Sequence, residues 1–218
     1  MSKISLKHSG GNVVSLNSPT NAPSAADVAF KLPNADGSAG QFMKTDGSGN
    51  LAFDTITIPA GGITMLDVWT ISTTADATSS GGDLTTNWVR ANAYQAVIGS
   101  AMTQSSGVFT FPSTGIYEVL FNAQFRYGNP YTRRYTTAYL DKVISGSASV
   151  MNESASHISG ISGNTYSIAR CTAYFDVTDV STHKVQFRTR AEGSTAVTTE
   201  HSNSYLTTFA SFKKLGDT

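Results

Sequence analysis

Tyrosine and arginine side chains gather in one short segment, RYGNPYTRRYTT at residues 126–137, around a Gly-Asn-Pro turn. These two residue types are enriched where proteins bind ligands, because they bury a large area and donate hydrogen bonds at a small entropic cost. Tyrosine faces also stack on sugar rings. We therefore take Tyr127, Tyr131, Arg133 and Arg134 as candidate receptor-contact residues. The alternative is an ordinary hairpin whose aromatic rings lie on the sheet or at a subunit contact.

The other polar residues form no recognisable catalytic or metal-binding set. The four histidines are scattered, with none at metal-ligand spacing from another. Asp176 and Asp179 lie in DVTDVS, where turn capping and a calcium site are both open. DGSGN at 46–50 has the composition of an ion-binding loop but lacks the EF-hand spacing. Nucleotide-binding, zinc-protease and serine-hydrolase motifs are absent from the sequence. We therefore expect no catalytic residue, cofactor or metal, and no enzyme activity.

Charge and hydropathy argue against two classes of partner. The formal net charge at pH 7 is +0, whereas neutralising phosphates needs a basic excess, so no nucleic-acid partner is expected. No apolar run approaches the roughly 20 residues of a membrane span, and the N-terminus lacks a signal-peptide apolar region, so we expect neither membrane insertion nor export. The single cysteine, Cys171, lies in the apolar stretch ARCTAYF and is expected to be buried and unreactive.

From residue 64 onward the sequence predicts an all-β domain. In FTFPSTGIYEVLFNAQF, residues 109–125, apolar side chains recur at every second position on both sides of a Pro- and Gly-bearing turn. Turn clusters such as QSSG, YGNP and SGNT separate such runs at intervals of about ten residues, which favours a sandwich of short strands. We expect strands at 66–72, 87–91, 96–101, 107–111, 116–127, 134–142, 147–151, 166–177, 183–191 and 204–215.

Residues 1–63 have a different composition. SKISLKH and VVSL alternate polar and apolar residues, and each predicts one short strand. Two similar phrases follow, ADGSAGQF and TDGSGNLAF, in which Asp-Gly lies beside a short apolar segment, a hairpin signal. Such small units cannot bury a core alone. We interpret 1–63 as an extended arm ordered by a neighbouring chain or a docking surface, with a partnerless linker as the alternative.

Residues 85–215 resemble the trimeric jelly roll shared by complement globular heads and tumour-necrosis-factor ligands. Gly107, Phe109, Pro112, Gly115 and Tyr117 match that family's strand, turn and following aromatic. AYLDKVISG at 138–146 is similar to a family strand and its turn, with Asp-Lys where Asn-Gly is usual. SYLTTFASFKKL at 204–215 is similar to the closing strand. The N-terminal phrases resemble those of phage virion fibres, whereas the collagen-like stalk of complement proteins is missing.

The resemblance implies a jelly-roll sandwich with an extended N-terminal arm, residues 64–218 forming a homotrimeric knob. In such a fold one set of aromatic rings fills the space between the sheets and another lines the three-fold axis. Which set each ring joins is left open, because a one-residue shift in register exchanges the two faces. The candidates for core or trimer interface are Phe109, Phe111, Tyr117, Phe121, Tyr205 and Phe209.

Three functions remain open at this point. The first is a non-enzymatic phage virion fibre or spike protein, assembled in the host cytoplasm, with residues 1–60 anchored to other virion proteins and the knob binding a host surface glycan or protein. The second is a capsid decoration or adaptor protein with a purely structural role. The third is a polysaccharide-degrading enzyme, which the lack of an evident carboxylate pair disfavours.

Overall fold

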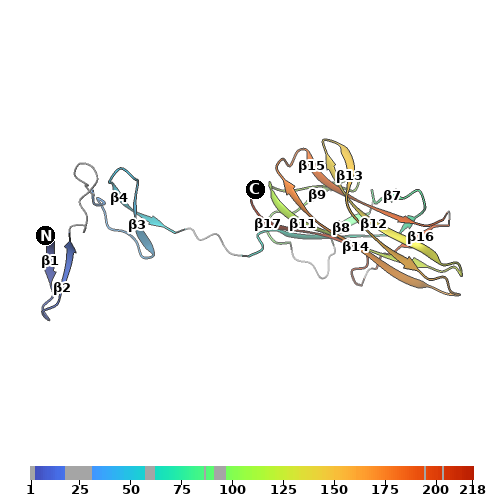
Figure 1. Ribbon diagram of the computed structural model, residues 1–218, viewed down its shortest axis with the longest axis horizontal. Helices are drawn as coiled ribbons and strands as arrows, with labels where there is room; N and C mark the ends of the chain where they lie inside the picture. The colour runs from blue at the N-terminus through green and yellow to red at the C-terminus, as the bar shows by residue number, and fades with distance from the viewer. Residues whose placement is uncertain are drawn as a thin grey trace. The chain divides into compact units, whose positions relative to one another are not determined.

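The computed structural model describes residues 3–17, 31–56, 62–85, 87–90, 97–193, 195–202 and 204–218. It divides into two units, Met1–Pro59 and Ala60–Thr218. Every regular element within the described residues is a β-strand (Figure 1). No helix in this described part is long and apolar enough to cross a membrane.

The described residues of the N-terminal unit form two hairpins. β1 (Lys3–Lys7) pairs antiparallel with β2 (Val13–Asn17), and β3 (Gln41–Thr45) pairs antiparallel with β4 (Leu51–Thr55). The strands predicted from SKISLKH and VVSL, and the hairpin predicted around TDGSGNL, are therefore confirmed.

The turn of the second hairpin is held by its first aspartate. The Asp46 carboxylate accepts hydrogen bonds from the backbone amides of Ser48 and Asn50 and from the Asn50 side chain. The Asn50 side-chain bond is the largest influence that lowers the pKa of Asp46, followed by the Ser48 amide. The oxygens of the DGSGN segment thus serve the turn itself.

The C-terminal unit is a sandwich of two antiparallel sheets. One sheet has the order β13-β12-β15-β10-β9, with β7 also beside β15. The other has the order β6-β16-β11-β17-β5-β8, and β14 pairs with the remaining side of β11. The strands are β5 (Leu66–Ile71), β6 (Ala75–Ala77), β7 (Gly82–Asp83), β8 (Trp88–Arg90), β9 (Thr103–Ser105), β10 (Val108–Thr110), β11 (Gly115–Tyr127), β12 (Arg133–Ile144), β13 (Ser147–Ile158), β14 (Thr165–Val177), β15 (His183–Ala191), β16 (Val197–Thr199) and β17 (Phe209–Gly216).

Aromatic rings from both sheets fill the space between them, as the alternating pattern predicts. Phe109 lies at the centre, with ring centroids 5.4 Å from Trp69, 5.2 Å from Trp88, 5.5 Å from Phe187 and 5.0 Å from Phe212. Four of the six predicted core or interface residues lie in this core, namely Phe109, Phe111, Tyr117 and Phe121. The other two lie outside it: Tyr205 is exposed, and Phe209 is half-buried on an outward sheet face.

Some predicted boundaries differ from the structure. The strand expected at 96–101 falls partly outside the described residues, and 97–101 forms only an isolated bridge between Ile98 and Leu66. The last strand begins at Phe209 rather than at residue 204, and the strand expected at 147–151 continues to Ile158.

The predicted Asp-Lys turn is also wrong. Asp141 lies inside β12, buried and paired with Arg188 on β15. The chain instead turns at Ser145 and Gly146, whose φ angles of 49° and 83° are the left-handed values that a tight two-residue hairpin requires.

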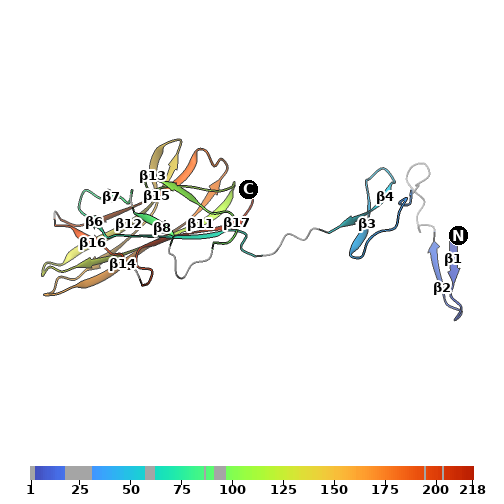
Figure 2. The ribbon, with the colours of Figure 1, turned by 180° about the vertical axis from the view of Figure 1, so that it is seen from behind.

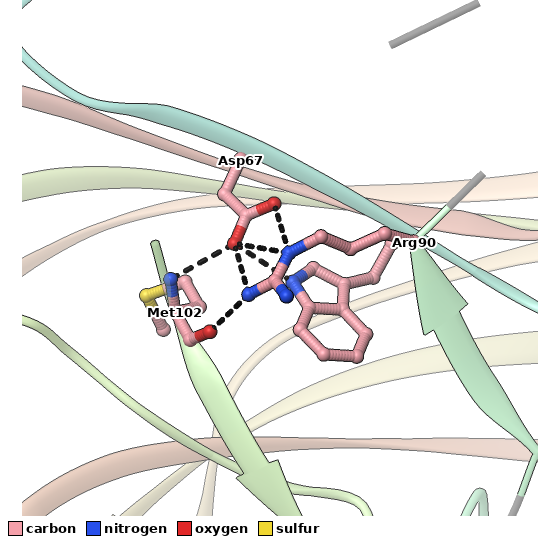
Figure 3. Close-up of polar contacts among 4 residues, drawn as sticks. Asp67, Arg90 and Met102 are labelled. Carbon is pink, nitrogen blue, oxygen red and sulfur yellow. Dashed lines mark hydrogen bonds and ion pairs between the residues drawn. The ribbon is translucent and has the colours of Figure 1, made fainter. Parts of the chain in front are cut away.

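A buried carboxylate joins three segments at one end of the core (Figure 3). Asp67 on β5 accepts hydrogen bonds from the Trp69 indole at 3.0 Å and the Met102 amide at 2.8 Å. The Arg90 guanidinium of β8 donates to both Asp67 oxygens and to the Met102 carbonyl, and it lies 4.3 Å from the Trp69 ring centroid. Asp67 is fully buried, so these donors replace the water that its charge would otherwise bind.

Small polar side chains link the two sheets along their edge strands, β13 of one sheet and β14 of the other. The Thr136 hydroxyl lies 3.1 Å from that of Ser156 and 3.0 Å from that of Ser167 on β14. Asn152 of β13 donates to the Thr172 carbonyl of β14 at 2.6 Å. The Asn152 bond occupies a backbone carbonyl of the edge strand β14 that would otherwise be open to pairing with another chain.

Cys171 lies inside the sandwich, as predicted. Its thiol is 2.9 Å from the Ala138 carbonyl, and desolvation by burial raises its pKa to about 12. The reactive thiolate is therefore very scarce at neutral pH, which agrees with an unreactive core cysteine.

Candidate binding surface

Two loops form one end of the sandwich, which we call the tip. They are residues 128–132, between β11 and β12, and residues 159–164, between β13 and β14. The Gly160 amide donates to the Thr132 hydroxyl, and a side chain on Gly160 would place its Cβ 2.3 Å from the Pro130 carbonyl oxygen. Only glycine permits this approach. The C-terminus lies at the opposite end of the unit (Figures 1 and 2).

The four predicted contact residues lie at or next to the tip, and they differ in exposure and in contacts. Tyr131 is 72% exposed, whereas Tyr127 is only 3% exposed, so the Tyr127 ring lies in the core and only Tyr131 presents its ring to solvent. Tyr127 continues the inward-facing alternation of β11. The Arg133 side chain is half-buried, with its guanidinium carbon 5.0 Å from the Tyr127 ring centroid. Arg134 points to solvent and contacts Glu192 instead.

Arg134 holds Glu192 through two donors. Its backbone amide and its side-chain Nε each donate to one oxygen of the Glu192 carboxylate. The bond from the Arg134 amide is the largest influence that lowers the pKa of Glu192, and the Arg133 charge acts in the same direction at lower strength. The Arg133 guanidinium lies beside the next residue, Gly193, but Arg134 makes the hydrogen bonds to Glu192.

A second surface covers the outward side of the sheet that contains β14. Three large side chains alternate outward along this strand: Tyr166, Ile168 and Tyr174, which are 56%, 53% and 66% exposed. In register beside them lie Arg126, Gln124 and Glu118 of β11. An antiparallel sheet usually turns polar residues toward water. We call this surface the β14 face; sequence reasoning missed it, although the period-two alternation of TYSIARCTAYFDV contains the signal.

The outward side of the other sheet is occupied by internal ion pairs. Arg188 donates to both oxygens of the buried Asp141 and lies 4.4 Å from the centroid of the Tyr139 ring. Beside it, Arg190 lies 5.5 Å from the Tyr135 ring centroid and donates to the Ser79 carbonyl. The raised pKa of Arg188 follows first from its hydrogen bond with Asp141. These charges stabilise the sheet rather than form an open acid–base pair.

Potential metal ligands do not cluster in the part of the chain that the structure describes. No three His, Cys, Asp or Glu side chains among those residues could hold a metal ion. Asp179 caps its own turn by accepting from the Ser181 amide and hydroxyl, and the hydroxyl bond is the largest influence that lowers its pKa. Of the two interpretations of DVTDVS, the contacts favour turn capping.

Comparison with known proteins gives structural matches only. The chain matches no family model, and no curated protein is significantly similar to it in sequence. The crystal structure of murine APRIL at pH 5.0 is 14% identical, with a TM-score of 0.49 over 69% of this chain and 98% of that one. The Eiger TNF structure from S. frugiperda is 13% identical, with a TM-score of 0.52 over 72% of this chain and 96% of that one. At this identity the match to Eiger speaks for the fold alone: the two-sheet sandwich is a jelly roll of the tumour-necrosis-factor type.

Proposed function

We propose that the chain is a non-enzymatic phage virion fibre or spike protein. In this proposal the jelly roll forms a homotrimeric knob that attaches to the host surface, and residues 1–60 bind other virion proteins. The observation that carries it is the β14 face, where three large side chains are left in water by a single chain. Large side chains left exposed on one face of a sheet mark that face as an interaction surface, here with Arg170 and Thr172 between Ile168 and Tyr174.

Self-association explains the β14 face better than a transient partner does. Tyr166, Ile168 and Tyr174 lie on the long strand β14. On the same side of the sheet lie half-buried Leu120 of β11, the strand beside β14, and half-buried Phe209 of β17, the next strand beyond β11. Obligate interfaces between copies are large and more apolar than transient ones. Three copies presented together also multiply weak host contacts, since avidity exceeds single-site affinity by about 10²–10⁴.

Replacing Ile168 with aspartate is expected to convert the trimer to folded monomer at low micromolar concentration. The new carboxylate would be buried without a partner in the trimer but solvated in the monomer, so only assembly is penalised. Light scattering should give three times the chain mass for the wild type and the chain mass for the variant.

The matched control is Val150→Asp, which places the same charge at an exposed aliphatic position on the outward side of the other sheet. It should leave the trimer intact. A wild type that is monomeric at every concentration, or a trimer that tolerates Ile168→Asp, would contradict the assembly proposed for the β14 face.

The N-terminal unit supports the anchoring part of the proposal. Ile4 of β1 pairs directly with Leu16 of β2, and Leu6 lies on the same side, two residues from Ile4. All three side chains are exposed in the single chain. A lone two-stranded hairpin is at best marginally stable in water, so this apolar side calls for a partner surface.

Deleting residues 1–60 is expected to leave a folded trimeric knob that no longer joins particles. The measurement compares incorporation of the full-length chain and of residues 61–218 into particles, together with saturable binding of each to host cells. Normal incorporation of 61–218 would remove the anchoring role. Binding to capsids but never to cells would favour the decoration role over attachment.

A further inference from the structure

Arg133 closes the tip end of the sandwich from inside. It pairs across the sheet with Ile158, which is almost fully buried, so the two side chains share the inward side. Its guanidinium covers the Tyr127 ring and lies so close to Gly193 that a Cβ there would come within 2.6 Å of an Arg133 terminal nitrogen. A cation therefore lies beside the buried side chains of Tyr127 and Ile158.

One buried nitrogen of this cation and the hydroxyl of the tyrosine beneath it have no hydrogen-bond partner. Within the described residues, neither the Tyr127 hydroxyl nor the Arg133 Nε makes a hydrogen bond, and both atoms are shielded from solvent. The nearby Glu192 carboxylate is engaged by Arg134. A buried donor without an acceptor is costly, and native proteins rarely keep one without a reason.

The charges at this place leave one positive charge uncompensated. Arg133 and Arg134 contribute two cations and Glu192 one anion, whereas Arg126 and Glu200 form their own ion pair at 2.6 Å. One carboxylate brings the set to neutrality and suits the paired donors of a guanidinium. A doubly charged phosphate would exceed that balance.

We propose that Arg133 and Tyr127 form a binding site for the carboxylate of an acidic polysaccharide, with Tyr131 as a stacking surface for the sugar ring. The inference rests on the proposed attachment function and names the chemical class of the receptor. The half-buried guanidinium is the accessible donor of this site, and the hydroxyl of Tyr127, whose ring the guanidinium covers, is the second donor. Tyr131, the most exposed ring of the tip, lies on the adjoining loop.

The test uses the full-length protein and oligosaccharides of galacturonate, glucuronate and mannuronate, each compared with its neutral methyl ester. The wild type should bind at least one acid form at least about tenfold more tightly than its ester, because a charge-assisted hydrogen bond is lost on esterification. Arg133→Gln should remove that preference, and Tyr127→Phe should weaken acid binding several-fold without lowering the melting temperature.

Arg190→Gln is the matched control, since it removes the same charge from an exposed arginine on the outward side of β15, the strand beside β12. It should change acid binding by less than about twofold. Equal affinity for acid and ester, tighter binding of inorganic phosphate than of any uronate, or unchanged binding by Arg133→Gln would overturn the inference.

Measuring binding to host cells distinguishes failure of the carboxylate site from failure of the proposed attachment function. Cells bound equally by wild type and Arg133→Gln would overturn the carboxylate site and leave attachment intact. Uronate binding that depends on Arg133, combined with no binding to any cell, would support the site and remove the attachment role.

Discussion

Replacing Asp67 with alanine is expected to lower the free energy of unfolding of the C-terminal unit by about 3–5 kcal/mol, the usual cost of removing one partner from a buried ion pair. The carboxylate is fully buried and accepts from Trp69, Arg90 and Met102. Alanine would leave the indole, the guanidinium and the Met102 amide without their shared acceptor. Urea unfolding of residues 61–218, followed by tryptophan fluorescence, measures the loss.

Two further variants separate the network from the mere loss of a carboxylate. Asp76→Ala removes an exposed aspartate from β6 and should change stability by less than about 0.5 kcal/mol. Asp67→Asn keeps one acceptor oxygen and should fall between the two. If Asp67→Ala and Asp76→Ala had equal effects, the Asp67 network would have no special part in stability.

Replacing Phe109 with alanine is the second change of large expected effect, at about 3–5 kcal/mol of lost stability. Phe109 is fully buried, and its ring contacts aromatic rings from both sheets, so truncation leaves a cavity that rigid neighbours fill poorly. The same urea experiment measures it, and the denaturant dependence should stay unchanged if the denatured state is unaffected.

Tyr131→Ala is its control, because this aromatic residue is mostly exposed at the tip. Its removal should alter stability by less than about 0.5 kcal/mol. A loss as large as that of Phe109→Ala would mean that the tip loop, and not the ring cluster, governs the stability of the sandwich.

The sequence predicts the central strands well because their alternation is strict. In β11 every second residue from Tyr117 to Phe125 is buried, and a period of two has only one structural interpretation at that length. The short strands β6, β7 and β16 carry too few residues for any period to be visible. They are defined by pairing instead: β7 pairs with the long β15, β16 with the long β11, and β6 with β16. The same strict alternation supports the placement of Phe109 and Phe121 in the core.

The binding surface is less predictable, because residue type does not give direction. Tyr127 is in phase with Phe125 and Phe121, and this phase is a signal within the sequence that points its ring inward. Arg133 carries no such signal, since its inward direction depends on its register with Ile158. The Asp67 network is equally hidden, because Arg90 and Met102 lie 23 and 35 residues further along the chain.

The direction of β5 has a mechanical consequence. β5 begins at Leu66, at the end of the unit that also holds the C-terminus, and its pairing with β17 runs from Leu66–Lys213 to Thr70–Phe209. In the proposed role, tension between particle and cell enters at Leu66 and leaves through the tip, along the strands. Because antiparallel hydrogen bonds lie across the strand direction, that tension loads the whole β5–β17 ladder in shear. A pull between Leu66 and the neighbouring C-terminus would instead unzip the same ladder bond by bond, so the knob is expected to be strongest in the direction in which a captured cell strains it.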